Sequence, residues 1–308
     1  MTPNILITEQ LSDEAFDWLA ARARVVRLSV DDSKFNEALA TANALIVRTY
    51  TVVDDALLQR APDLTVVGRA GVGLDNIDLG ACADRDVRVV HTPDSNTQAV
   101  VEYVLSVMSH ALRPLHPITG ASDAAQWGQL RNDVTVLRQW SDLRLGILGC
   151  GRVGSRVACL AKAIGMETAC CDLRQLDLDQ LHGARQVDLD TLLRTSDVLS
   201  VHVDGRPENR QLLTTEHFNA MPQDALLINT SRGFVLDHAA LAGVLMQRPA
   251  MRAMLDVHDP EPVGADNPLL GLPNATLYPH AASRTQTAQR AMSWVVRDVA
   301  GALGLPMD

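Results

Sequence analysis

The sequence has few aromatic residues and no excess of positive charge. Aromatic residues make up 4% of its 308 residues, and 27 Lys and Arg are outnumbered by 37 Asp and Glu, which gives a formal net charge of -10. An acidic chain without a run of Lys or Arg argues against nucleic acid or an anionic membrane as a partner. We therefore expect any anion-binding site to be a local cluster of basic side chains.

Long apolar runs and paired cysteines are also missing. No run of 18 apolar residues occurs, and the N-terminal segment lacks the basic and apolar regions of a signal peptide. The cysteines form no CxxC pair and no spacing with histidine that is typical of a metal site. These features predict a soluble cytoplasmic protein without a bound metal, with five reduced cysteines used for packing: Cys82, Cys150, Cys159, Cys170 and Cys171.

The pattern that is present alternates short β-branched runs with helical stretches, which is typical of βαβ units and predicts an α/β fold with parallel sheets. A first series of expected strands covers residues 4–8, 44–48, 64–69 and 87–92. After an expected helix at 96–112, a second series covers residues 143–148, 167–172, 198–203, 225–230, 251–257 and 275–278. The length favours two domains. We expect a final helix at about 283–303 to pack back on the N-terminal region, which gives one domain of residues 1–98 plus 283–308 and another of residues 99–282.

The second series begins with a glycine-rich loop, GCGRVG at 149–154, between an apolar strand and a helical run. Gly149 permits a tight turn, Gly151 lets backbone approach a pyrophosphate, and Gly154 allows close helix packing. Arg152 and Val153 open the helix, whose N-terminus favours phosphate. The next strand ends at Asp172, 18 positions after Gly154, near the distance expected for the acid that binds the adenosine ribose. This pattern predicts a dinucleotide site, and the charge of Asp172 favours NAD, although the nearby Arg174 is compatible with a 2′-phosphate.

Three further candidates follow expected strands of the same series: Arg232, Glu261 and His280. Because ligands of open α/β sheets bind at the carboxyl ends of strands, the three can converge on one site. A guanidinium holds a carboxylate in a fork, and a histidine exchanges a proton near neutral pH. A carboxylate beside the histidine favours its protonated form. Such a set suits reversible reduction of a carbonyl, but from spacing alone an ordinary loop role for each residue stays open.

The chain resembles the D-isomer-specific 2-hydroxyacid dehydrogenase family, and within it the D-3-phosphoglycerate dehydrogenase branch in its short form without a regulatory domain. The matching segments occur in family order across nearly the whole chain. They are VRT (47–49), VGRAGVGLDNID (67–78), TPDSN (92–96), LGCGRVG (148–154), NTSRG (229–233), LDVHDPEP (255–262) and PHAAS (279–283).

The resemblance implies an NAD-dependent oxidoreductase that acts on a small 2-hydroxy or 2-oxo acid, with Arg232 orienting the substrate and Glu261 pairing with the acid/base His280. It implies that Thr230 and Asp256 lie near the cofactor. It also implies a homodimer, and two doubly wound parallel-sheet domains, with a Rossmann NAD-binding domain inserted in a flavodoxin-like substrate domain. Substrate-binding residues are then expected in the first domain: Arg48, Thr49, Arg69, Gly71, Val72, Gly73 and Asn96.

A buried arginine at a strand end is costly without an anionic partner, and in the branch that the chain resembles the arginines that match Arg48 and Arg69 face the substrate. The resemblance thus implies a substrate with a second anionic group, with 3-phosphoglycerate as the first candidate, while a role in surface salt bridges stays open for both arginines. Three segments depart from the family pattern: Ser95, residues 204–209 and residues 141–144. Sulfolactate or phosphonolactate dehydrogenase and hydroxypyruvate or glyoxylate reductase therefore stay as alternatives. A corepressor-like scaffold that senses NAD is the alternative outside enzymes. Because the sequence ends at Asp308, we expect no feedback regulation by serine through a C-terminal domain.

Overall fold

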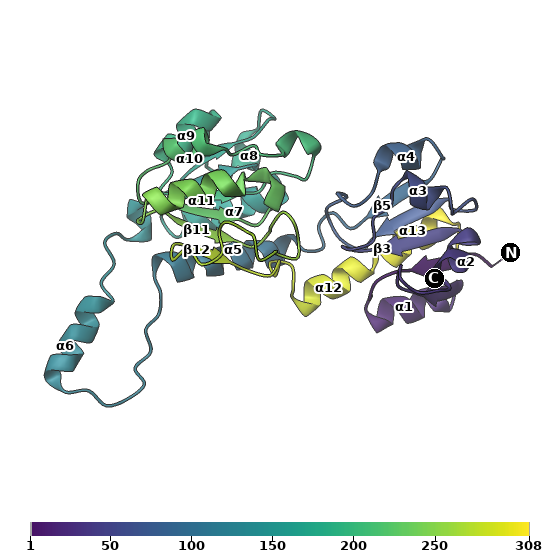
Figure 1. Cartoon of the computed structure of the whole chain (residues 1–308), viewed down its shortest axis with the longest axis horizontal. Helices are drawn as coiled ribbons and strands as arrows, with labels where there is room; N and C mark the ends of the chain where they lie inside the picture. Colours follow the sequence, from purple (N-terminus) through teal and green to yellow (C-terminus); the bar gives the residue numbers. More distant parts are fainter. Residues whose placement is uncertain (1, 308) are drawn as a thin grey trace. The chain divides into compact units, whose positions relative to one another are not determined.

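A computed structural model describes residues 2–307, which form two compact units (Figure 1). Unit 1 comprises Met1–Ala99 and Ser283–Asp308, and unit 2 comprises Val100–Ala282. Each unit is a parallel sheet with helices on both faces. The predicted fold class, two doubly wound parallel-sheet domains with one interrupted by the other, is confirmed.

Unit 1 has five strands in the order β2-β1-β3-β4-β5. The strands are β1 (Asn4–Ile7), β2 (Arg24–Arg27), β3 (Ala44–Val47), β4 (Val66–Arg69) and β5 (Arg88–His91). Its helices are α1 (Asp13–Ala20), α2 (Phe35–Ala40), α3 (Asp55–Leu58), α4 (Leu79–Ala83), α12 (Gln286–Ser293) and α13 (Val295–Ala302). The helix α5 (Thr97–Leu112) begins in unit 1 and continues into unit 2.

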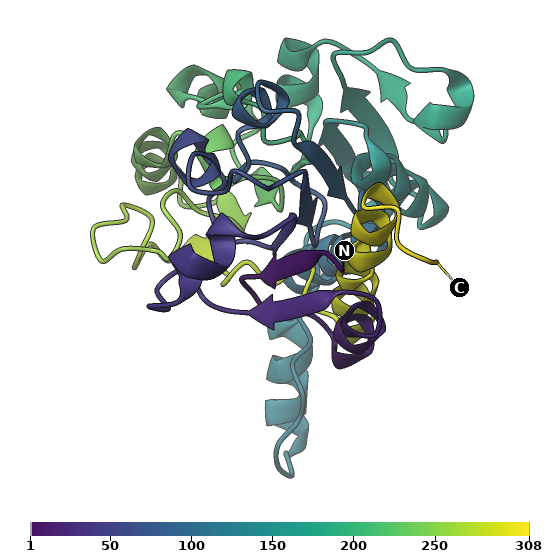
Figure 2. The ribbon, with the colours of Figure 1, turned by 90° about the vertical axis from the view of Figure 1, so that its right-hand side faces the viewer.

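Alternating side chains of the unit 1 strands fill two cores. On β1, Leu6 packs with α2, α3 and α4, whereas Ile5 and Ile7 pack with α1 and α13. A Cβ atom added at Gly68 in β4 would overlap Val299 of α13, so the absence of a side chain allows this helix to approach the sheet. Both views show the C-terminal helices beside the N-terminal strands (Figure 2).

The structure corrects two predictions about unit 1. The expected helix at 283–303 is two helices, α12 and α13, which meet at Trp294. The Trp294 ring packs edge-on against Trp18 with ring centroids 6.2 Å apart. The short strand β2 was not predicted, because it lies at the sheet edge, is mostly exposed and carries arginine at both ends, so no apolar run marks it.

Unit 2 has seven strands in the order β12-β11-β10-β9-β6-β7-β8. They are β6 (Arg144–Leu148), β7 (Glu167–Cys171), β8 (Arg185–Gln186), β9 (Val198–Val201), β10 (Leu226–Asn229), β11 (Arg252–Leu255) and β12 (Ala275–Leu277). Six were predicted, and the two-residue strand β8 was missed. Besides α5, the helices are α6 (Ala124–Asp133), α7 (Arg152–Ala163), α8 (Leu178–Leu181), α9 (Leu189–Thr195), α10 (Thr215–Ala220) and α11 (His238–Gln247), with 3-10 turns at Trp140–Asp142, Pro207–Asn209 and Gly233–Val235.

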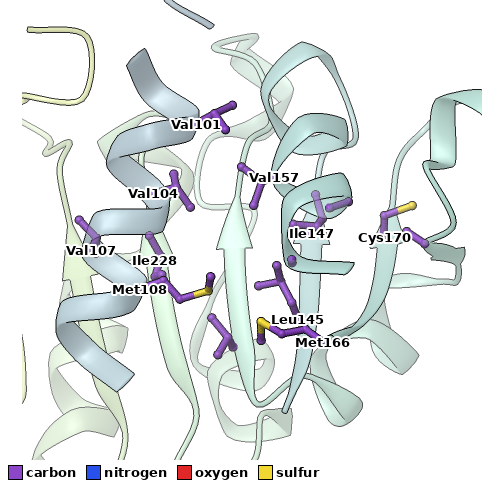
Figure 3. Close-up of a cluster of buried hydrophobic side chains, with 14 of the residues drawn as sticks. Val101, Val104, Val107, Met108, Leu145, Ile147, Val157, Met166, Cys170 and Ile228 are labelled. Atoms are coloured by element: carbon purple, nitrogen blue, oxygen red, sulfur yellow. The ribbon is translucent and has the colours of Figure 1, made fainter. Parts of the chain in front are cut away.

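The two faces of the unit 2 sheet bury different helices. The face that carries Leu145 and Ile147 packs on α5 and α7, and Figure 3 shows Val104 and Met108 of α5 directed toward the strands. The opposite face packs on α9, α10 and α11. Burying one such aliphatic side chain stabilises the folded state by about 1.5–3 kcal/mol. The helices on the two faces thus hold the strands, and with them the strand ends, in place.

The order of the strands reverses at β6, which has β7 on one side and β9 on the other. The chain leaves β6 into α7 on one face and leaves β9 toward α10 on the other. Loops at the carboxyl ends of these two strands therefore diverge, and this is where nucleotides bind in sheets of this type.

The segment that contains α6 stands apart from the rest of unit 2 in both views (Figures 1 and 2). None of the α6 residues is buried. Among the described residues, no helix has the length and apolar character needed to cross a membrane.

Candidate functional site

The glycine loop lies at the point where the strand order reverses. Gly149 follows β6 with a φ of +91°, a backbone conformation that favours glycine, and donates its N–H to the carbonyl of Cys171 at 2.8 Å. A Cβ atom there would lie 2.7 Å from the nitrogen of Val203 and 2.8 Å from the carbonyl carbon of His202, just beyond β9. Gly154 packs so closely on the Gly149 carbonyl that a side chain would overlap it. The glycines thus serve the turn and the packing that their spacing predicts.

The residues around this loop fit a dinucleotide. Gly151 is the N-cap of α7 and provides no side chain to cap it, and a Cβ atom at Gly151 would meet nothing within 4 Å. The N-terminus of α7, which begins with Arg152 and Val153, therefore has no capping side chain, and helix N-termini of this kind bind phosphate. The hydroxyl of Thr230 is buried without a hydrogen-bond partner, so it is suited to a ligand group.

Asp172 lies one residue beyond β7 and accepts the N–H of Cys150 at 2.9 Å. Its carboxylate also binds Arg174, with Nε at 2.9 Å from Oδ1 and Nη2 at 3.0 Å from Oδ2. Burial raises the pKa of Asp172, but hydrogen bonds from Arg174 and Cys150 outweigh it and hold the pKa below its usual value. The acid is therefore ionised and lies beside the glycine loop, but it already has a cationic partner.

His280 and Glu261 lie together. The imidazole Nδ1 donates to Oε2 of Glu261 at 2.7 Å, and the other carboxylate oxygen accepts the N–H of His258 at 2.8 Å. Burial raises the pKa of Glu261, but these hydrogen bonds outweigh it and lower the pKa below its usual value. An ionised carboxylate thus fixes one ring nitrogen of His280 and leaves Nε2 for other chemistry.

Asp256 holds the loop that carries His280. This buried carboxylate accepts the N–H groups of Ala281 at 2.8 Å and Ala282 at 2.9 Å, and its own carbonyl accepts the N–H of His280 at 2.9 Å. His280 has a φ of +51°, uncommon for a residue with a side chain, and these bonds hold it there. Burial raises the pKa of the Tyr103 phenol on α5, and the adjacent charge of Asp256 raises it further.

Arg232 follows β10 in a loop that Asn229 shapes. Asn229 accepts the N–H of Ser231 at 2.9 Å and donates to the carbonyl of Arg232 at 2.9 Å. The next residue, Gly233, packs on the backbone of His258, where a Cβ atom would overlap the carbonyl group. The Arg232 loop is thereby fixed against the segment that leads into Glu261, so the three strand-end loops form one connected structure.

In unit 1, the loop after β3 wraps around the carboxylate of Glu9. Four successive backbone N–H groups donate to it, from Arg48 at 2.9 Å, Thr49 at 2.9 Å, Tyr50 at 3.1 Å and Thr51 at 3.2 Å. The backbone of Thr49 is thus occupied by Glu9. Glu9 was not among the predicted site residues, although it also follows a strand, β1, and had the same positional signal.

The guanidinium of Arg48 donates to the Gln10 carbonyl at 3.0 Å and to the side chain of Gln289. Burial lowers the pKa of Arg48, Glu9 raises it and Arg284 lowers it. Arg284 therefore lies close enough for its charge to act on Arg48. No sequence pattern pointed to this second arginine, because it is exposed and far from Arg48 along the chain.

The other candidates of unit 1 follow β4 and β5. The Arg69 guanidinium lies against Gly71, in the space that a Cβ atom of Gly71 would need. His91 Nδ1 lies 3.0 Å from the carbonyl of Val72, which Gly73 follows. Ser95, where the family pattern has glycine, donates to the carbonyl of Thr92 at 2.9 Å. This bond tightens the turn before Asn96, which precedes α5.

No group of three or more His, Cys, Asp or Glu that could hold a metal ion occurs between residues 2 and 307.

Comparison with known proteins gives a consistent family assignment for unit 2. The model described as D-isomer specific 2-hydroxyacid dehydrogenase, NAD binding domain, matches residues 105–282. The chain is 33% identical to a D-3-phosphoglycerate dehydrogenase of Archaeoglobus fulgidus over 98% of its own length but 58% of that protein. It is 35% identical to an (S)-sulfolactate dehydrogenase of Chromohalobacter salexigens, over 98% of this chain and 99% of the relative.

Among solved structures, a D-lactate dehydrogenase from Aquifex aeolicus, complexed with NAD and lactic acid, matches with a TM-score of 0.84 at 26% identity. That match covers 98% of this chain and 96% of the other. The chain thus spans little more than half of the phosphoglycerate dehydrogenase that it matches, but nearly the whole length of the other two proteins.

Proposed function

Because the chain belongs to the D-isomer specific 2-hydroxyacid dehydrogenase family and contains its NAD-binding domain, we propose that it catalyses reversible hydride transfer between NAD(H) and a small 2-hydroxy or 2-oxo acid. The single observation that carries this proposal is the 2.7 Å hydrogen bond between His280 and Glu261 in a loop fixed by Asp256. When bound by the glycine loop and Asp172, NAD would accept the hydride during oxidation of the hydroxy acid, and NADH would donate it during reduction of the oxo acid. We assign unit 2 to the cofactor and unit 1 to the substrate.

The proposed roles follow from the geometry of each side chain. Glu261 holds Nδ1 of His280, so Nε2 gives a proton to the substrate oxygen during reduction and removes it during oxidation. The ionised carboxylate stabilises the imidazolium that exists between these steps. The planar fork of Arg232 binds the substrate carboxylate and orients the adjacent carbonyl. Asp256 and Thr230 complete the cofactor side of the site.

We further propose that the substrate carries a second anionic group, which Arg48 binds. This proposal is supported by a pair of cations in unit 1: Arg48 and Arg284 are near enough for their charges to repel each other. The carboxylate of Glu9 balances one of these two positive charges, so an anion beside Arg48 and Arg284 would balance the other. Arg69, the backbone of Gly71, Val72 and Gly73, and the side chains of Thr49 and Asn96 remain proposed substrate contacts. A 3-phosphoglycerate is the first candidate, and a sulfolactate is the second because that relative matches over its whole length.

The decisive experiment measures kcat/KM with NADH for five oxo acids: 3-phosphohydroxypyruvate, sulfopyruvate, phosphonopyruvate, hydroxypyruvate and glyoxylate. We expect an acid with a second anionic group to be the best substrate. Arg48→Ala should raise KM for that acid about tenfold or more, the effect of losing about 1.4 kcal/mol of binding. Arg24→Ala, an exposed arginine on β2, serves as the control. An equal rise of KM for glyoxylate would refute the anionic pocket, and no turnover of any acid would refute the activity.

We propose that the protein forms a homodimer, because the segment around α6 exposes apolar side chains. Six large apolar side chains between residues 113 and 139 are exposed, at 90% for Leu115, 56% for Ile118, 48% for Trp127, 42% for Leu130, 43% for Val134 and 92% for Leu137. Apolar side chains gathered on a projecting segment indicate a protein interaction site, and a second copy of the chain is the proposed partner. Light scattering should give about 67 kDa, twice 33.4 kDa, and half of that for a Trp127→Asp/Leu130→Asp variant. A monomeric wild type at micromolar concentration would exclude this assembly.

The cytoplasmic location inferred from the sequence stays a prediction.

A further inference from the structure

The carboxylate of Asp172 has all of its acceptor positions filled. Oδ1 accepts the N–H of Arg174 at 3.0 Å and its Nε at 2.9 Å. Oδ2 accepts the N–H of Cys150 at 2.9 Å and Nη2 of Arg174 at 3.0 Å. A carboxylate offers about four lone-pair positions, and Arg174 occupies three of them.

This arrangement conflicts with the role of Asp172 as the acid that binds the adenosine ribose. A ribose hydroxyl must donate to the same oxygens, so the Arg174 side chain has to leave at least one of them. The Cys150 N–H belongs to the glycine loop and stays in place. Arg174 is free to move, because its side chain is 59% exposed while that of Asp172 is 10% exposed. A ribose hydroxyl can therefore displace part of this bidentate pair, at the cost of the hydrogen bond that Arg174 gives up.

The charges around Asp172 also differ from those of a strict NAD site. A lone carboxylate at this position repels the 2′-phosphate of NADP, whereas an arginine nearby accommodates it. Arg174 neutralises Asp172, and its Nη2 reaches the Cys150 carbonyl at 3.3 Å, so the guanidinium spans the edge of the glycine loop. Arg206, in the loop after β9, lies near enough for its charge to interact with that of Asp172. The adenosine end of the site therefore has one cation on Asp172, which is Arg174, and a second nearby, Arg206, that is already paired with Asp204.

We propose that Arg174 sets the cofactor preference: it competes with the adenosine ribose for Asp172 and, once displaced, lies beside the 2′ position, so that the enzyme binds NADPH as well as NADH. This inference rests on the proposed function, since it concerns the same cofactor site. It assigns Arg174 two opposite effects. The side chain weakens NADH binding, because its bonds to Asp172 must be broken, and it strengthens NADPH binding, because a guanidinium pairs with phosphate.

The test is a fluorescence titration of the full chain with NADH and with NADPH, without substrate, so that binding is read independently of turnover. The wild type should bind the two cofactors with dissociation constants within about tenfold of each other. Arg174→Gln should bind NADH about threefold more tightly and NADPH at least about tenfold more weakly. Arg174→Lys, which keeps the charge but lacks the fork, should retain NADPH binding. Arg185→Gln on the edge strand β8 removes the same charge from an exposed position and should change neither constant.

The outcomes distinguish a failure of the cofactor site from a failure of the role of Arg174. If the wild type binds neither cofactor, the proposed function itself is wrong. If the wild type binds NADH but Arg174→Gln leaves the ratio of the two dissociation constants unchanged, only the role of Arg174 is wrong. Circular dichroism of each variant confirms that the fold is retained. If the glutamine variant does not fold, Arg174→Lys decides the matter, because loss of NADPH binding in that variant would contradict the proposal.

Discussion

Nδ1 of His280 lies 2.7 Å from Oε2 of Glu261, and this contact joins a histidine with a left-handed backbone conformation to a carboxylate 19 residues earlier in the chain. Because the carboxylate can only accept, the proton on His280 is fixed on Nδ1 and Nε2 is left to react. Glu261 is in turn held by the N–H of His258. The geometry of the pair is therefore determined before substrate binds.

Replacing His280 by alanine should lower kcat by about 10²–10⁴, the usual contribution of a general acid or base. NADH binding should change little, because the glycine loop and Asp172 lie at another strand end. Stopped-flow turnover and a fluorescence titration of NADH measure the two effects separately. His110→Ala, at an exposed position near the end of α5, is the matched control. Turnover like that of the wild type would show that His280 is not the proton donor.

Glu9→Ala should disorder the loop that carries Arg48. Four backbone N–H groups lose their common acceptor, and the expected result is a higher KM for the oxo acid with an unchanged dissociation constant for NADH. Because the four donors form a small anion-binding nest, formate or acetate added at tens of millimolar should partly restore KM. Glu14→Ala on the exposed start of α1 is the control. A KM equal to that of the wild type would mean that Glu9 does not position the loop.

Gly233→Ala should destabilise the protein and misplace Arg232. The added Cβ would overlap the backbone of His258, which cannot move without shifting Glu261, and overpacking of this kind costs about 1–3 kcal/mol. Gly243→Ala in α11 makes the same chemical change where nothing lies within 4 Å. That control should raise stability by up to about 1 kcal/mol, since alanine favours helix. Urea denaturation measures both, and equal midpoints for the two variants would contradict the packing argument.

His202 should make the protein less stable in mild acid. Burial lowers its pKa from 6.5 to about 4, and its Nδ1 is buried without a hydrogen-bond partner. Between these pH values the unfolded chain binds a proton that the folded chain does not, so stability is full above pH 6.5 and falls as the pH drops toward 4, by at most about 3 kcal/mol. His202→Gln should flatten this part of the pH profile, whereas His110→Gln should not. If stability changed with pH in the same way in the wild type, His202→Gln and His110→Gln, His202 would not be the group that titrates.

Patterns local in the sequence were enough to establish the class of the fold and the elements that carry the chemistry. β-branched runs alternating with helical runs require parallel strands with crossover helices, since each strand must bury both faces. The glycine spacing at 149–154 is local in the chain, so the roles of Gly149 and Gly154 in the turn and its packing were readable from it, whereas ribose binding by Asp172 stays a prediction. Arg232, Glu261 and His280 could likewise be placed after strands, because the apolar runs that mark those strands are local in the sequence. Short exposed strands such as β2 and β8 were missed because they bury too little to leave an apolar pattern.

The partners of these residues became known only from the folded structure. Asp172 is already bound by Arg174, four N–H groups converge on Glu9, and Arg284 acts on Arg48 from the other end of the chain. Hydrogen bonds and charges act over a few ångströms of space, whatever the separation along the sequence. His280 was therefore recognisable as a candidate from its residue type and position, whereas its orientation was set by Asp256 and Glu261, which the fold brings to it.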